Sequence, residues 1–111
     1  MIARIWRARA TRKGADEYAR HFRSVVAPEL QAMDGCEGSM LLQRDDGGSV
    51  EVTVVSLWTS LDVIRAFAGD PIETAVVHPA AARALLDFDK AVRHHDVVAF
   101  WSPDHSKSVA P

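Results

Sequence analysis

The sequence predicts an α+β domain in which helices cover one face of an antiparallel sheet. The first observation behind this prediction is the stretch 50–69, which passes from a strand into a helix and ends at a glycine. Residues 50–58 are mostly β-branched or apolar, which is typical of a strand buried on both faces. Thr59 with Asp62 three positions later fits a helix N-cap, and Gly69 fits the left-handed residue that ends a helix.

The second observation is a loop of aspartates and glycines at residues 45–49, between two extended segments. Both residue types tolerate positive φ, so the loop predicts a hairpin in which residues 36–44 pair antiparallel with residues 50–58. Residues 1–9 predict another strand, and each of its faces mixes apolar and cationic side chains. These segments supply three strands of the expected sheet.

The first helix is predicted between the first two strands. Asp16 and Glu17 are expected in its first turn, where the helix dipole favours acids. Pro28 removes an amide donor, so we expect a kink or a restart of the helix near Ala27. His21 falls at the edge of the apolar stripe and is interpreted as a partly exposed surface histidine. The stripe indicates a core-facing side and consists of Tyr18, Phe22, Val25, Val26, Leu30 and Met33.

Further helical segments and a last strand are expected after the glycine. Residues 70–73 combine a cap, a proline and an acid, which predicts a helical turn reaching His78. Pro79 then predicts the start of a final helix, and residues 92–101 predict a fourth strand. The buried side of the final helix is expected to consist of Ala81, Ala82, Leu85, Leu86 and Phe88.

The order strand, helix, strand, strand, helices, strand is the split βαβ, or ferredoxin-like, arrangement with a four-stranded antiparallel sheet. The domain is expected to span residues 1–101, followed by a polar, flexible tail at 102–111. The third and fourth strands carry apolar residues on both sides, so the sheet face without helices also requires a cover. A second copy of the chain would provide it, and we therefore expect a homodimer.

Composition limits the classes of partner. The chain has 111 residues, is 48% hydrophobic and carries 13 basic and 15 acidic side chains, for a formal charge of -2. These values favour one domain and give no support for binding nucleic acid or an anionic membrane. The longest apolar run, near residues 52–58, is far shorter than the ~20 residues of a spanning helix. Cys36 is alone, so no internal disulfide is possible and a reducing cytoplasm is the simplest setting.

Several short motifs together resemble the antibiotic biosynthesis monooxygenase family, over about the first hundred residues. They open with residues 2–6 (IARIW), continue with Pro28-Glu29-Leu30 and with Leu57-Trp58 before Ser60-Leu61, and close with Val92 and His94 before Val97. Between these lie 64–69 (IRAFAG) and Ala75-Val76 with Pro79 three positions later. The resemblance implies a dimeric α+β barrel, built by pairing two ferredoxin-like sheets, with a pocket between the helices and the sheet of each protomer.

The resemblance also implies a chemistry. Relatives of this type oxidise polycyclic aromatic or quinol-like compounds with molecular oxygen and with no flavin or metal cofactor. Another branch degrades haem with an asparagine, a tryptophan and an axial histidine. The present sequence contains no asparagine, which argues against the haem branch. It also lacks C-x-x-C pairs and H-x-x-x-H spacing, so no metal site is expected. The resemblance implies that no cofactor is needed.

Two histidines are the candidate catalytic bases. His94 matches the family's histidine and could deprotonate a phenolic substrate, because imidazole titrates near neutral pH. The alternative is a buried histidine satisfied by the backbone or by Asp96. His78 precedes a proline at a break between helical segments, where a side chain can overhang a pocket mouth, but it could equally be a cap or an exposed loop residue.

Four more residues are candidates for binding the substrate. Trp6, Trp58 and Phe67 would offer flat apolar walls to an aromatic ligand. All three are equally suited to the core, and for Phe67 the core is the favoured interpretation. Arg4 could orient a phenolate or carboxylate, or could pair with an acid across a dimer interface. The sequence thus favours a cofactor-independent monooxygenase acting on a small aromatic or polyketide-like molecule. A non-catalytic ligand-binding protein, or an isomerase or lyase on the same scaffold, stays open as an alternative.

Overall fold

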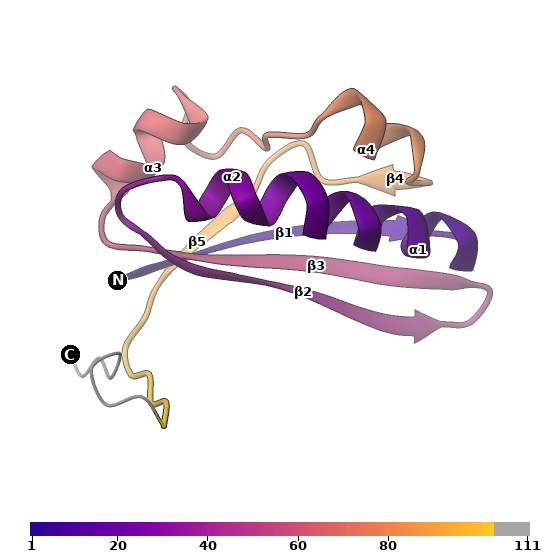
Figure 1. The fold of residues 1–111 in the computed structure, drawn as a ribbon, viewed down its shortest axis with the longest axis horizontal. Helices are drawn as coiled ribbons and strands as arrows, with labels where there is room; N and C mark the ends of the chain where they lie inside the picture. Colours follow the sequence, from indigo (N-terminus) through magenta and orange to yellow (C-terminus); the bar gives the residue numbers. More distant parts are fainter. Residues whose placement is uncertain (104–111) are drawn as a thin grey trace.

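The sheet is built around β1 (Ile2–Ala10) and β3 (Ser49–Trp58), which pair antiparallel along their whole lengths. The computed structural model describes residues 1–103, so positions 104–111 of the expected tail lie outside the described residues. β2 (Cys36–Asp46) pairs antiparallel with β3 and completes the predicted hairpin. The strand order β2-β3-β1-β4 is that of a ferredoxin-like sheet, and Figure 1 shows the helices on one face of it.

The edge beside β1 differs from the single strand predicted at residues 92–101. Two short strands, β4 (Asp87–Phe88) and β5 (Arg93–Asp96), pair antiparallel with opposite ends of β1. The residues between them bond to another segment: Lys90 accepts from the Ala75 amide at 2.9 Å, and Val92 donates to the Glu73 carbonyl at 2.7 Å. These hydrogen bonds to residues 73–75 interrupt the edge strand. β4 and β5 therefore share one position beside β1, and the sheet has five strands in four positions.

The first helical unit has three parts: α1 (Arg12–His21), the π-helical segment η1 (Phe22–Val26) and α2 (Ala27–Gln31). The Thr11 hydroxyl caps α1 by accepting from the Gly14 amide at 3.0 Å. The helix therefore begins earlier than predicted, and Asp16 and Glu17 lie beyond its first turn. The α-helix resumes at Ala27, beside Pro28, as the sequence predicts. Because Pro28 has no amide N–H, the change of register leaves no donor of that residue unpaired.

Helix α3 (Leu61–Ala68) follows β3 directly. Its N-cap is Ser60 and not the predicted Thr59, because the Ser60 hydroxyl accepts from the Val63 amide at 3.3 Å while the Thr59 amide still donates to the Gly35 carbonyl. Gly69, with φ 76°, ends the helix as predicted.

The helical turn predicted from residue 70 to His78 is absent. This segment contains turns, and its residues 73–75 form hydrogen bonds with residues 90–92, which satisfy backbone groups that a helix would have used. Helix α4 (Pro79–Arg83) begins at the predicted proline but ends before Leu85. Leu86 is consequently 57% exposed, not buried as expected, and Phe88 belongs to β4.

Two clusters of buried side chains lie between the sheet and the helices. The larger joins Trp6, Val50 and Val52 of the sheet to Tyr18 and Phe22 of the first helical unit. The smaller consists of Leu30, Trp58 and Ile64. None of the described helices is long and apolar enough to cross a membrane.

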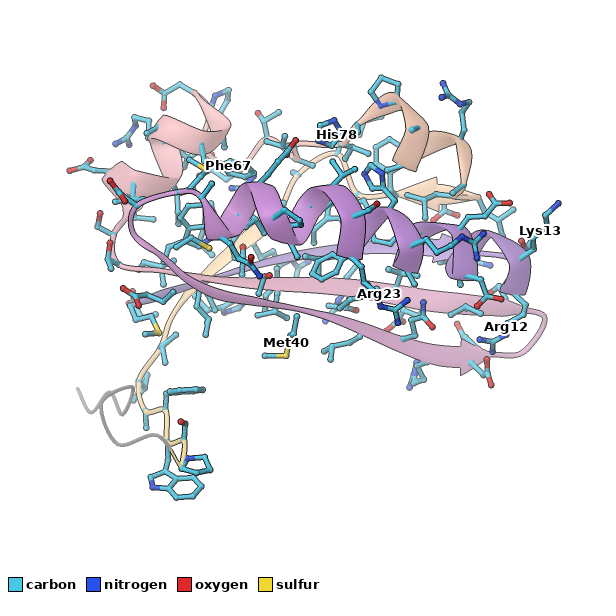
Figure 2. All side chains as sticks on the ribbon, viewed as in Figure 1. Arg12, Lys13, Arg23, Met40, Phe67 and His78 are labelled. Carbon is cyan, nitrogen blue, oxygen red and sulfur yellow. The ribbon has the colours of Figure 1, made fainter. Side chains whose placement is uncertain are left out.

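The opposite face of the sheet carries no helix. Met40 and Leu42 of β2 are 44% and 47% exposed on this face. Figure 2 shows the Met40 side chain pointing away from the helical layer. Val55 and Ile5, which lie in register with Met40 across β3 and β1, point the same way, because side chains directly opposite each other share a face. The described chain thus leaves an apolar sheet face uncovered.

Candidate functional site

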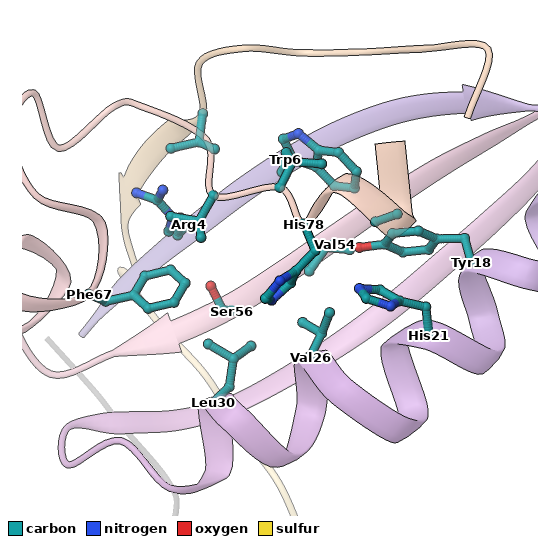
Figure 3. Close-up of a pocket in the computed structure, with 14 residues that line it drawn as sticks. Arg4, Trp6, Tyr18, His21, Val26, Leu30, Val54, Ser56, Phe67 and His78 are labelled. Carbon is teal, nitrogen blue, oxygen red and sulfur yellow. The ribbon is translucent and has the colours of Figure 1, made fainter. Parts of the chain in front are cut away.

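A pocket opens between the helical layer and the sheet, and the empty space there is about 560 Å³ when the open solvent at its mouth is counted. Its walls come from β1, β3, the first helical unit, α3 and the segment around α4 (Figure 3). The polar side chains on these walls are few, and most of the lining is aliphatic or aromatic. The lining residues that carry the argument below are Arg4, Trp6, Tyr18, His21, Phe67 and His78.

One end of the pocket is cationic. Arg4 extends from β1, is only 5% exposed, and donates to the carbonyl oxygens of Ile72 and Thr74 at 2.7 and 2.8 Å. Its guanidinium carbon lies 5.7 Å from the centre of the Phe67 ring, within cation–π range. Within residues 1–103, Arg4 forms no ion pair with a carboxylate. Burial lowers the Arg4 pKa, yet a guanidinium stays charged in proteins. The pocket therefore contains a buried cation that forms no ion pair among these residues, although the charge of Glu73 partly offsets the effect of burial on its pKa.

His94 lies behind Arg4 and does not line the pocket. It is opposite Arg4 in the β1–β5 register, and its Nε2 is 2.9 Å from Arg4 Nη1. A guanidinium can only donate, so Nε2 accepts and the His94 imidazole is neutral. Burial and the charge of Arg4 lower the pKa of His94. The geometry thus connects this predicted base to Arg4 and not to the pocket directly.

His78 does line the pocket, as a residue that overhangs a pocket mouth would. It precedes α4, and its Nε2 lies 3.2 Å from Glu29 Oε2 on α2. When Nε2–H donates to this carboxylate, Nδ1 of the neutral ring carries the lone pair that can accept a proton. The side chain is 40% exposed, so it is accessible at the pocket mouth.

His21 is a site residue that the sequence interpretation missed. It ends α1, lines the pocket, and its ring lies 5.9 Å from the Tyr18 ring and 5.5 Å from the His78 ring. Its Nε2 is buried and has no hydrogen-bond partner among the described residues. The sequence signal was the spacing of three from Tyr18, which places both side chains on one side of the helix.

The predicted aromatic walls divide into two groups. Trp6 and Phe67 line the pocket, and Trp6 Nε1 donates to the Asp89 carbonyl at 2.9 Å. Trp58 is completely buried in the smaller core cluster and does not line the pocket. Its Nε1 donates to the Ser56 hydroxyl at 2.8 Å, and Ser56 is itself part of the lining. Residues 1–103 contain no group of three or more His, Cys, Asp or Glu side chains arranged to hold a metal ion.

The fold is that of small α+β proteins with a ferredoxin-like sheet, and here a mostly apolar pocket with Arg4 in its wall lies between the helices and the sheet. Within that class, a family model described as antibiotic biosynthesis monooxygenase matches residues 1–78. The chain therefore belongs to the antibiotic biosynthesis monooxygenase family.

The chain is also similar to curated proteins. Two uncharacterised proteins of Mycobacterium tuberculosis, MT2635 of strain CDC 1551 and Rv2558 of strain H37Rv, are each 35% identical over 80 residues. The match covers 68% of this chain, which spans only about a third of the length of these relatives (33%).

Two solved structures share the fold. One is described as "a putative antibiotic biosynthesis monooxygenase" from Caulobacter crescentus, with TM-score 0.62 and 19% identity over 87% of this chain and 89% of that one. The other is Rv0793 from Mycobacterium tuberculosis, with TM-score 0.54 and 20% identity over 91% of this chain and 98% of that one. At these identities the similarity shows the fold alone.

Proposed function

We propose that this protein is a cofactor-independent monooxygenase that oxidises a small aromatic or polyketide-like compound with molecular oxygen. The observation that carries the proposal is Arg4, a buried guanidinium without a carboxylate partner among the described residues, at the wall of a mostly apolar pocket. A buried charge is costly unless it is paired, so such a pocket favours a ligand with an apolar body and an acidic oxygen. Phenols, enols and quinols have this chemistry.

In the proposed reaction the substrate supplies the electrons. His78 accepts a proton from the substrate, and Glu29 holds the His78 ring through Nε2. Arg4 stabilises the resulting oxyanion, because a fixed cation in a desolvated site favours charge that develops next to it. The anion then transfers an electron to oxygen, after which one oxygen atom enters the substrate and the other leaves as water. We give His94 the role of positioning Arg4, through the contact at Nε2.

The test is oxygen uptake with anthrone, whose methylene group becomes a carbonyl as anthraquinone and water form. Wild-type protein should consume one molecule of O2 for each molecule of anthraquinone formed. The rate of uptake should be well above the rate without protein. His78→Phe removes the base and keeps a ring of similar size, so uptake should fall about 100-fold. Arg4→Gln should reduce it by a similar factor.

Circular dichroism establishes that each variant is folded. Uptake no faster than the protein-free rate, or equal turnover in wild type and both folded variants, would remove the proposal. Binding of anthrone without oxygen uptake would instead support the non-catalytic ligand-binding alternative, since the same buried Arg4 suits a protein that holds an aromatic anion without oxidising it.

We also propose that the protein works as a homodimer in the cytoplasm. The uncovered apolar face with Met40 and Leu42 supports pairing of two sheets, because exposed apolar patches of this kind mark interaction surfaces. The solitary Cys36 supports a reducing compartment.

A further inference from the structure

His21 Nε2 is the one buried side-chain nitrogen or oxygen in residues 1–103 that has no hydrogen-bond partner. A buried polar atom without a partner costs free energy, so its presence in a pocket wall requires an explanation. Figure 3 places His21 and Tyr18 toward one end of the pocket and Arg4 and Phe67 toward the other, with Trp6 and His78 between them. The unpartnered nitrogen thus lies across the pocket from the buried cation.

The two side chains at this end of the pocket, His21 and Tyr18, are polar and neutral. Burial and the neighbouring His78 lower the pKa of His21, while the charge of Glu29 has the opposite, smaller effect. Burial also raises the pKa of Tyr18 to about 12, so its phenol is neutral at pH 7. A neutral imidazole offers one N–H donor and one lone pair. This end of the pocket therefore suits a neutral oxygen, whereas the Arg4 end suits an ionised one.

We infer that His21 forms a hydrogen bond with a second, neutral oxygen of the ligand, a hydroxyl or carbonyl on the side of the aromatic body away from Arg4. The inference rests on the proposed ligand pocket and adds a specificity-determining residue to it. With this hydrogen bond, the pocket binds aromatic compounds that carry an oxygen at both ends more tightly than compounds that carry an oxygen at one end only. The cost of desolvating His21 is already present in the free protein, so a ligand that satisfies Nε2 gains the full hydrogen bond.

The experiment measures anaerobic binding of two probes that differ by one oxygen. 1-Naphthol carries one hydroxyl, and 1,5-dihydroxynaphthalene carries hydroxyls on opposite sides of the same ring system. By isothermal titration calorimetry, the wild type should bind the diol about tenfold more tightly than the mono-ol, as expected for one added hydrogen bond to an unsatisfied group. His21→Phe keeps an aromatic ring but has no nitrogen. It should lose the preference, with the affinity for 1-naphthol unchanged.

Three variants separate a ligand contact from a packing role. His21→Gln, which retains an N–H donor, should recover part of the preference. His95→Gln, a histidine control outside the pocket, should keep it. Arg4→Gln should lower the affinity for both probes by the same factor, because both present a hydroxyl to the Arg4 end of the pocket. Thermal melts identify any variant that is unfolded.

The outcomes distinguish the two proposals. If the wild type binds both probes with equal affinity, or if folded His21→Phe keeps the tenfold preference, the role of His21 is wrong while the aromatic pocket stands. If neither probe binds the wild type, the aromatic pocket of the proposed function fails, and the inference fails with it.

Discussion

At the scale of single residues, two histidines are held in the neutral state by their surroundings. His94 faces Arg4, Glu73 and His95, and its pKa is lowered by burial first and by Arg4 second. His21 faces His78, Glu29 and Tyr18, and its pKa is also lowered by burial first. Both shifts favour the neutral imidazole, whose ring lone pair can accept a hydrogen bond. At His94 the donor is Arg4, and at His21 it would be a hydroxyl of the ligand.

These shifts predict how stability depends on pH. Each histidine has a folded pKa below its unfolded value of about 6.5, so below that pH the unfolded chain binds more protons than the folded chain. Their contribution to stability should therefore be complete above pH 6.5 and decrease as the pH falls through the folded pKa values. Urea unfolding at pH 7.5, 6.5 and 5.5 measures the effect.

A histidine variant tests whether His94 causes this pH dependence of the free energy of unfolding. His94→Gln keeps an acceptor for Arg4 but does not titrate, so its free energy of unfolding should change less between pH 7.5 and 5.5 than that of the wild type. His95→Gln is the matched control, because the neighbouring His95 side chain is exposed, and it should retain the wild-type slope. A steeper or unchanged slope in His94→Gln would contradict the assignment.

At the scale of elements, the start of α3 shows how one hydroxyl sets a boundary. Ser60→Ala should lower the free energy of unfolding by about 1 kcal/mol, because it removes the acceptor of the Val63 amide. Thr59→Ala removes the neighbouring hydroxyl, which does not cap the helix, and should change stability by less than about 0.5 kcal/mol. Chemical denaturation of the two variants checks the assignment, and a larger effect of Thr59→Ala would reverse it.

The turn between α2 and β2 depends on Gly35. This residue has φ 89°, and an added Cβ would lie 2.6 Å from Val63 Cγ1, so both the backbone and the available space exclude a side chain. Gly35→Ala should destabilise the protein by roughly 2 kcal/mol, from strain and crowding together. Gly48→Ala is the control, because a Cβ there has no neighbour within 4 Å and the φ of Gly48 is not positive. Thermal or urea unfolding that shows equal losses in the two variants would refute this account.

At the scale of the whole molecule, the uncovered sheet face gives a prediction about assembly. Leu42→Glu places a charge on the face that we propose is buried between two sheets, so the dissociation constant of the dimer should rise at least about 100-fold. Sedimentation velocity measures the change. Leu86→Glu is the matched control, because Leu86 is also an exposed leucine but belongs to the region beside α4. A wild type that sediments as a monomer, or a Leu42→Glu variant that stays dimeric, would contradict the proposal.

Local sequence signals account for much of the molecule. The hairpin and the helix that follows are specified by the β-branched and apolar residues of 50–58, the glycines at 47 and 48, and the capping and ending residues of α3. The error is one position at the cap. These features depend on contacts between residues close in sequence. The order of the predicted elements indicated the topology, and the family motifs, spread over the chain, added the position of the pocket.

The tertiary structure decided the remainder. The segment 70–78 has helical signals but bonds to residues 90–92 instead, and the same contacts divide the edge strand. Arg4 and His94 are 90 residues apart in sequence, and His78 and Glu29 are 49 apart, so neither pair could be inferred from local spacing. His21 resembled a surface residue because helical periodicity shows which side of a helix faces the core but not which segment lies opposite. The sequence by itself therefore determined the first three strands, the helices that follow two of them, the topology and the family. The site and the edge of the sheet depended on long-range packing that places separate elements against each other.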